Sequence, residues 1–369
     1  MTDDFVTELR LQLRDVALQD ERRGRVGLGF VRARRGLPGP EPVAAVALAV
    51  LLAVAVALGA LQLRGEREPE APKVVGTYRV ADGLSSLAPG FGSVWSADPI
   101  RGDVLRIDPR TRRVIARIPV GGEARVAAGA GAVWVVAGDL QYGGGEGPVR
   151  LLRIDPRTNR VVARIPMRTD TGARFVPADV RIVGGAVWAV GLDGVLRVDP
   201  RTDSPGLHIA LGTPAGDPRG IVITEHDVWA LSASGRLVRY DARDGRAAGA
   251  ERVRAPVAAY LIGGPSGRLM LLLGRGGLAL LDPSDGRLAW RVAAGKDIGW
   301  VQGREGELWV QVSAPESGDI TRDRLLRLDP ETGRRRGAIE LPAAGVAGMA
   351  DVGRELWTAT PSGTITVIR

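Results

Sequence analysis

The stretch Gly131-Ala-Val-Trp-Val-Val136 is followed by Leu152-Arg-Ile-Asp-Pro-Arg-Thr158 and then by Val161-Val-Ala-Arg-Ile-Pro166, and the chain repeats this order of motifs along most of its length after residue 74. The first motif is a short apolar run, and in the other two motifs apolar residues recur at every second position, which is the side-chain period of a β-strand. A repeat of about forty residues that is built from short strands predicts a β-propeller or a related array.

A tryptophan marks the same position in nearly every copy of the repeat, and Met270 fills that position in the copy that lacks one. Seven such anchor positions predict an all-β, seven-bladed propeller, with six or eight blades as the alternatives if one unit is divided differently. The tryptophan anchors are Trp95, Trp134, Trp188, Trp229, Trp309 and Trp357.

A second motif follows each anchor and ends in Asp-Pro in most copies, as in Leu105-Arg-Ile-Asp-Pro-Arg-Thr111, whereas the fourth copy, Val238-Arg-Tyr-Asp-Ala-Arg243, lacks the proline. The apolar residues two apart face one side of a strand and the arginine faces the other. Asp-Pro then opens a tight turn, because proline fixes φ and the carboxylate bonds to the backbone ahead. Each unit is therefore expected to be an antiparallel meander of an inner strand, the tryptophan strand, the Asp-Pro strand and an outer strand.

The two ends of the repeat region complement each other. The last unit stops after residues 364–368 and lacks its outer strand, and an orphan strand at residues 74–80 precedes the first unit. Pairing the orphan strand with the last unit would close the ring and hide sheet edges that otherwise invite aggregation.

These units resemble the virginiamycin B lyase-like and YVTN-type propellers in their Gly-x-Val-Trp-Val and Ile-Asp-Pro-x-Thr-x-x-Val motifs. Leu281-Asp-Pro-Ser-Asp-Gly-Arg-Leu-Ala-Trp290 is similar to a blade of the quinoprotein-like (PQQ-type) propellers. The resemblance covers about residues 74–369 and implies the fold. The shared residues are structural, so an activity does not follow from them.

The lyase-like resemblance also implies a histidine general base, an acid and a divalent cation on one face of the ring. The chain has two histidines, His208 in an outer strand and His226 in a turn before a tryptophan strand. Neither is expected to face the ring axis, so His226 is at most a weak catalytic candidate. No phosphate-binding loop and no metal-ligand cluster with suitable spacing occurs, so no metal site or cofactor is indicated.

Composition removes further classes of function. The absence of cysteine excludes thiol catalysis and thiolate metal sites, and leaves the compartment open. The net charge of +8 comes almost entirely from arginine, with lysine only at Lys73 and Lys296. The arginines recur at equivalent outward strand positions among acids, which is typical of a solvated rim rather than of a nucleic-acid footprint.

Residues 43–61 carry no charged or strongly polar side chain. At the rise of an α-helix they span about 29 Å, which matches the hydrocarbon core of a bilayer. We predict an uncleaved signal anchor at 43–63, with a cleaved signal peptide as the alternative. Six arginines shortly before the span place the N-terminus in the cytoplasm and the propeller outside it. The predicted division is a cytoplasmic segment at 1–42, the anchor, a linker at 64–73 and the propeller at 74–369.

The first twenty residues are expected to form an amphipathic helix, with Val6, Leu9, Leu13 and Val16 on one stripe. Three interpretations stay open: a helix on the inner membrane surface, a docking helix for a cytoplasmic partner, and a self-pairing coil.

Propellers usually bind ligands at the funnel around the ring axis, so the residues that begin the inner strands are the binding candidates. Arginines there could pair with anionic groups, and aromatic rings could stack on a ligand ring or a sugar. An alternative is that the charged residues only pair with one another across the mouth. These residues, nine or ten positions before each anchor, are Ser86, Arg125, Asp179, Arg219, Tyr260, Trp300 and Gly348.

The sequence thus predicts a membrane-anchored extracytoplasmic propeller that binds a ligand or a protein and serves as a sensor or scaffold. The ligand-binding candidates are Arg125, Asp179, Arg219, Tyr260 and Trp300. The alternative function is a lyase-like enzyme with a metal-assisted site on the funnel face.

Overall fold

The computed structural model describes residues 71–369 except 139–148, 192–193, 212–219, 255–258, 275, 295–296, 305, 315–321 and 344. The predicted N-terminal helix and anchor lie outside the described residues, so both stay predictions. In the part of the chain that is described, no helix has the length and apolar character needed to cross a bilayer.

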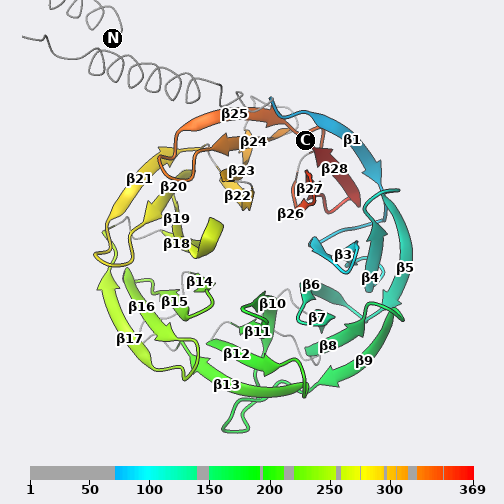
Figure 1. Cartoon of the computed structure of the whole chain (residues 1–369), viewed down its shortest axis with the longest axis horizontal. Coiled ribbons are helices and arrows are strands. Elements are labelled where there is room, and N and C mark those ends of the chain that lie inside the picture. Colours follow the sequence, from blue (N-terminus) through cyan, green and yellow to red (C-terminus); the bar gives the residue numbers. More distant parts are fainter. Residues whose placement is uncertain are drawn as a thin grey trace, which may run out of the picture. The chain divides into compact units, whose positions relative to one another are not determined.

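The described part of the chain folds into seven four-stranded antiparallel sheets arranged as the blades of a ring, which confirms the predicted seven-bladed propeller. In each blade the first strand lies nearest the ring axis and the last forms the rim (Figure 1). The predicted order of strands within a blade is confirmed as well.

The first three blades contain these strands: β2 (Ala88–Gly90), β3 (Ser93–Asp98), β4 (Asp103–Asp108) and β5 (Arg113–Pro119) in blade 1; β6 (Glu123–Gly129), β7 (Ala132–Gly138), β8 (Arg150–Asp155) and β9 (Arg160–Ile165) in blade 2; β10 (Pro177–Val183), β11 (Ala186–Gly191), β12 (Gly194–Asp199) and β13 (Ser204–Ala210) in blade 3.

The next three blades contain these elements: β14 (Ile221–Ile223), β15 (Asp227–Leu231), β16 (Arg236–Asp241) and β17 (Ala247–Arg252) in blade 4; β18 (Tyr260–Gly263), the 3₁₀ helix η1 (Pro265–Gly267), β19 (Leu269–Leu273), β20 (Gly277–Leu281) and β21 (Leu288–Ala293) in blade 5; β22 (Asp297–Arg304), β23 (Glu307–Ala314), β24 (Arg322–Leu328) and β25 (Arg335–Glu340) in blade 6.

Blade 7 closes the ring with strands from both ends of the propeller. β26 (Gly348–Val352), β27 (Glu355–Ala359) and β28 (Thr364–Ile368) are completed by β1 (Val74–Arg79), which pairs antiparallel with β28. The orphan strand therefore takes the predicted outer position.

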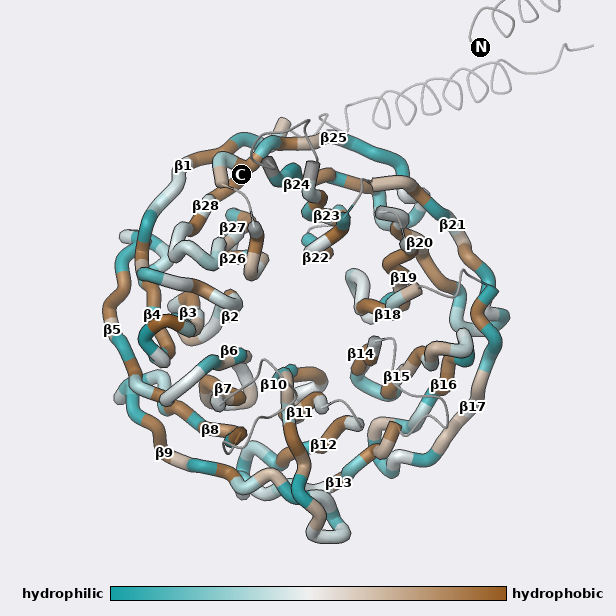
Figure 2. The backbone as a smooth tube through the Cα atoms, turned by 180° about the vertical axis from the view of Figure 1, so that it is seen from behind, coloured by the Kyte–Doolittle hydropathy of each residue, from teal (hydrophilic) through white to brown (hydrophobic). Residues whose placement is uncertain are grey.

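The core consists of apolar residues that pack between neighbouring blades. The anchors Trp95, Trp134 and Trp357 are fully buried, and Met270 occupies the equivalent buried position in blade 5. The rim strands β5 and β9 instead alternate exposed and half-buried residues, and Figure 2 shows hydrophilic and hydrophobic segments alternating along the rim. The alternation matches one face packed on the blade interior and one in water.

The Asp-Pro motif builds the predicted turn. The carboxylate of Asp108 accepts hydrogen bonds from the backbone N–H groups of Arg110 at 2.7 Å and Thr111 at 3.2 Å. These N–H groups lower the pKa of Asp108, because they bond to the charged form of the carboxyl. The same aspartate-to-backbone bond recurs at Asp155 and Asp329, so the turn is a repeated structural device.

Candidate functional site

Two faces of the ring carry different parts of the repeat. Every blade runs the same meander, so all inner strands begin at one face, which we call the first face. The turns that join inner strands to tryptophan strands, and Asp-Pro strands to outer strands, lie at the opposite face, which we call the turn face. The predicted binding candidates that are described begin inner strands at the first face, and His226 lies in the β14–β15 turn at the turn face.

The predicted charged candidates at the first face are engaged within the ring. Asp179 in β10 accepts a hydrogen bond from Arg181 Nε at 3.1 Å on the same strand and another from its neighbour Val180 N at 2.8 Å. Arg125 in β6 donates to the carbonyl of Ala124 at 3.3 Å. Arg219 lies outside the described residues. The pairing of Asp179 is thus within one strand, rather than across the mouth.

The aromatic candidates at the first face remain accessible. Tyr260 begins β18 and is 51% exposed, and Trp300 in β22 of the next blade is 37% exposed. The indole Nε1 of Trp300 donates to the carbonyl of Val346 at 2.8 Å. This bond connects the indole to the segment that precedes β26 of blade 7. Trp300 is therefore held in place while part of its surface stays in water. Ser86 precedes β2, and Gly348 is buried at the start of β26.

In blades 1 to 4 the anchor tryptophan is paired with an arginine of the next strand. Trp134 lies opposite Arg153 in the strand register, and the Arg153 guanidinium stacks on the indole at 5.6 Å. The same side chain donates to the Asp203 carboxylate of blade 3 at 3.0 Å, so it also links neighbouring blades. Equivalent stacks occur at Trp95, Trp188 and Trp229. Arg239 is exposed and Arg153 is half-buried, so these arginines stack on the indoles while they keep contact with water.

Blade 5 lacks both members of this pair. Met270 stands in place of the tryptophan, and the residue opposite it in the register is Leu280 in place of the arginine. Arg239 in the preceding blade 4 stacks on Trp229 but pairs with Asp227 of its own blade at 3.1 Å. The arginine that links blades 2 and 3 thus has no equivalent in blade 5.

A groove of about 1050 Å³ opens at the turn face beneath blades 4 and 5. Its walls come from the β14–β15 turn, from η1 and its flanks, and from the β20–β21 turn. Trp229 is only half-buried at this groove, whereas Trp134 is fully buried. The principal lining side chains are Val222, Thr224, Glu225, His226, Asp227, Trp229, Ser266, Arg268, Leu269, Leu280, Leu281, Asp282, Pro283 and Glu331.

The β14–β15 turn that carries His226 is built differently from the other turns of this kind. In blade 2 the equivalent turn has Ala130 at φ 48° and Gly131 at φ 79°, a conformation that favours glycine. His226 has no positive φ. The hydroxyl of Thr224 instead accepts a hydrogen bond from Asp227 N at 3.0 Å, and Thr224 N donates to Asp227 O at 2.8 Å.

The missing proline of the fourth repeat has a structural reason. The backbone N–H of Ala242 donates to the carbonyl of His226 at 2.8 Å. Proline has no N–H and could not make this bond. Ala242 therefore fixes the position of the turn that carries Glu225 and His226, both of which are exposed.

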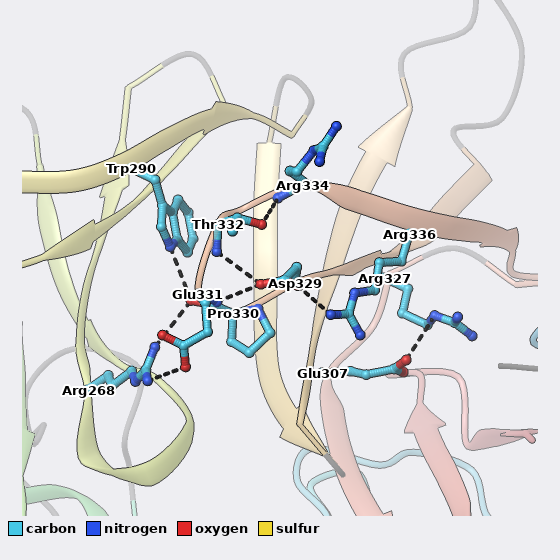
Figure 3. Close-up of polar contacts among 10 residues, drawn as sticks. All are labelled: Arg268, Trp290, Glu307, Arg327, Asp329, Pro330, Glu331, Thr332, Arg334 and Arg336. Carbon is cyan, nitrogen blue, oxygen red and sulfur yellow. Dashed lines mark hydrogen bonds and ion pairs between the residues drawn. The ribbon is translucent and has the colours of Figure 1, made fainter. Parts of the chain in front are cut away.

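Hydrogen bonds and an ion pair near η1 link blade 5 to blade 6 (Figure 3). Arg268, which follows η1, donates to the Pro330 carbonyl at 3.3 Å and forms an ion pair with Glu331. Trp290 Nε1 donates to the same Pro330 carbonyl at 3.1 Å. This link lies at the end of the groove and orients the Glu331 carboxylate there.

The turn next to this link holds a strongly acidic carboxyl. Burial raises the pKa of Asp329, but the N–H of Thr332, the guanidinium of Arg336 and the N–H of Glu331 together outweigh it and hold the pKa at about 2. Asp329 is therefore an anion at any ordinary pH, and its role is to hold the turn.

In the described part of the chain, no group of three or more histidine or acidic residues is placed to hold a metal ion. His226 and the axial aromatic residues lie at opposite faces, so the predicted residues do not form one site. His208 is half-buried in β13, edge-on to Phe175 at 5.6 Å.

Sequence reasoning missed the groove although its signals were visible one by one. Met270 departs from the tryptophan, Ala242 from the proline and His226 from the glycine of the repeat. All three departures fall in blades 4 and 5. The clustering of these departures in two neighbouring blades is the feature from which the groove could have been predicted.

By sequence, no family model and no curated protein matches the chain. Solved structures match its fold. The WD40 β-propeller domain of Doa1 is 10% identical, with a TM-score of 0.62, and the match covers 81% of this chain and 97% of that one. BamB from Moraxella catarrhalis is 14% identical, with a TM-score of 0.52, and the match covers 81% of this chain and 98% of that one. These likenesses show the β-propeller fold. They leave open the virginiamycin B lyase-like and YVTN resemblance.

Proposed function

We propose that this chain is a binding module whose first face holds a protein partner around the ring axis. The observation that carries the proposal is the exposure of Tyr260 and Trp300 on neighbouring inner strands. Aromatic side chains supply large contact areas with few rotatable bonds, so they are enriched at protein interfaces and at their energetic centres. Arg125, half-buried on β6, adds a donor on the same face.

The proposal includes the predicted membrane topology. An anchor at 43–63 with the N-terminus inside would display the propeller outside the cytoplasm. In this arrangement the module is a sensor if residues 1–42 engage a cytoplasmic partner, and a scaffold if they lie on the membrane surface.

Site-specific photo-cross-linking from full-length protein in native membranes tests the interface. A photoreactive phenylalanine at position 260 should give a discrete cross-linked protein. The matched control places the same residue at Ile115, which is 54% exposed on the rim strand β5. Equal products from both positions, or none from position 260, would reject the first face as the interface.

Substitutions then separate the contributions. Trp300→Ala and the double variant Arg125→Ala/Arg219→Ala should each reduce the yield of that product severalfold while the ring stays folded. Removing residues 1–42 distinguishes the sensor from the scaffold. A cytoplasmic partner lost on truncation supports the sensor, and envelope partners that are retained support the scaffold.

The lyase-like alternative has no observation in its favour. His226 lies in a turn at the face opposite to the axial aromatic residues, away from the position that the resemblance implies for a general base. We therefore propose no second function.

A further inference from the structure

We propose that the groove beneath blades 4 and 5 binds an extended peptide segment of a partner protein in which lysine or arginine flanks an apolar side chain. The groove lies at the turn face, so this is a site separate from the proposed interface around the ring axis. It is defined by the lining residues given above.

The groove has an apolar floor of suitable size. Val222, Leu269, Leu280 and Leu281 contribute to it, together with the half-buried Trp229. At about 1050 Å³ it is at the upper end of the range of small-molecule sites, which run from roughly 300 to 1,000 Å³. An open groove of this size accommodates several residues of a peptide chain.

The charged residues that line the groove determine which partner it can bind. Four carboxylates line the groove, on Glu225, Asp227, Asp282 and Glu331, against the single guanidinium of Arg268. The chain as a whole carries a net charge of +8, so this groove is an acidic exception on a basic protein. Such a surface attracts cations and repels phosphate groups.

The carboxylates are not equally available. Asp227 pairs with Arg239, Glu331 pairs with Arg268, and Asp282 accepts from Ser284 Oγ at 2.6 Å. Glu225 is exposed and has no side-chain partner among the residues that the structure describes. Its carboxylate is therefore the group that a basic side chain of the partner would pair with.

The backbone around η1 keeps the groove accessible. Gly263, Gly264 and Gly267 line it and present main chain without a side chain. Leu280 lies where the regular blades carry an arginine, and an arginine there would extend into the same region. The departure from the repeat in blade 5 thus replaces an arginine that links blades with an apolar side chain that lines the groove.

The test measures binding of two synthetic fluorescent peptides to the full chain by anisotropy. One carries the alternating sequence Arg-Leu-Arg-Val-Arg, and the other replaces each arginine with glutamate. We expect saturable binding of the basic peptide and at least tenfold weaker binding of the acidic one. No saturable binding of the basic peptide, or equal binding of both, would overturn the proposal.

Matched variants locate the site. Glu225→Lys should weaken the basic peptide at least tenfold, whereas Glu251→Lys, the same charge change on the exposed rim strand β17 of the same blade, should change it less than twofold. Equal losses would mean unspecific charge attraction and would refute the groove. Leu280→Arg, which restores the repeat's arginine, should also block binding.

Circular dichroism confirms that each variant is folded, and the exposed Glu225 keeps the test valid if Leu280→Arg does not fold. Sedimentation of the full chain checks the other occupant, a second copy. Self-association abolished by Glu225→Lys would assign the groove to that copy and overturn a foreign partner. Cross-linking from position 260 is independent of all these outcomes.

Discussion

Blades 2 and 5 are built on the same repeat but have different residues at the anchor position and opposite it. Blade 2 fills it with Trp134 and Arg153, and the arginine continues to Asp203 of the next blade. Blade 5 places Met270 opposite Leu280 and links to blade 6 from η1 at the turn face. The difference teaches that in this propeller the repeated residues maintain the ring, and that the departures from the repeat in blade 5 put apolar side chains where blade 2 has a stacked arginine.

The largest expected effect on stability comes from removing an anchor tryptophan. Trp134→Ala deletes a fully buried indole whose Nε1 donates to Gly129 O at 3.2 Å, so the free energy of unfolding should fall by about 3–5 kcal/mol. Trp229→Ala is the matched control at the groove, where the indole is half-buried, and should cost less than half as much. Chemical denaturation followed by circular dichroism measures both. Equal losses would remove the distinction between the blades.

Proline at position 242 would restore the repeat in blade 4. We expect Ala242→Pro to destabilise the protein by about 1–3 kcal/mol, because the bond from Ala242 N to His226 O is lost and the turn loses this support. Pro156→Ala, the reverse change in blade 2, should cost less than about 1 kcal/mol. A stabilising Ala242→Pro substitution would show that the turn does not depend on this bond.

A smaller effect is expected from the link between blades. Arg153→Met keeps the length of the side chain but removes the ion pair with Asp203 and the stack on Trp134. Its cost should be about 1 kcal/mol, because both charged groups remain partly in water. Arg157→Met, on an exposed residue of the following turn, should be neutral. A double-mutant cycle with Asp203→Asn gives the coupling between the partners, and zero coupling would reject the link.

An effect of similar size is expected in acid. The pKa of Asp329 is about 2 in the folded protein, below its unfolded value of roughly 3.9. Its contribution to stability is therefore complete above about pH 4 and is lost as the pH falls towards 2. Asp329→Asn should reduce the difference in unfolding free energy between pH 6 and pH 3 by about 1 kcal/mol, after allowance for solvent screening. An unchanged pH dependence would show that this turn is not acid-sensitive.

The ring itself could be predicted from the sequence because its determinants are local and repeated. Alternation gives the strands, Asp-Pro gives the turns, and the surplus strand before the first unit predicts closure. The groove could not be predicted in the same way. Met270 and Leu280 are ten positions apart, and only the register of β19 and β20 places them opposite each other. The pairing of Asp179 with Arg181 was within reach of the sequence, because residues two apart on a strand share a face.

The pairing of β1 with β28 has a consequence for the order of events during synthesis. Val74 emerges from the ribosome before almost all of the propeller, whereas its partner Ile368 lies in β28, which follows all the other strands of the ring. Until then β1 lacks its neighbour, and blade 7 cannot be completed. The ring therefore remains open until β28 has been made, and it then closes over one of the longest sequence separations that the fold contains. A chaperone that shields β1 would act during that interval, and a chain cut short before β28 would leave the strand permanently unpaired.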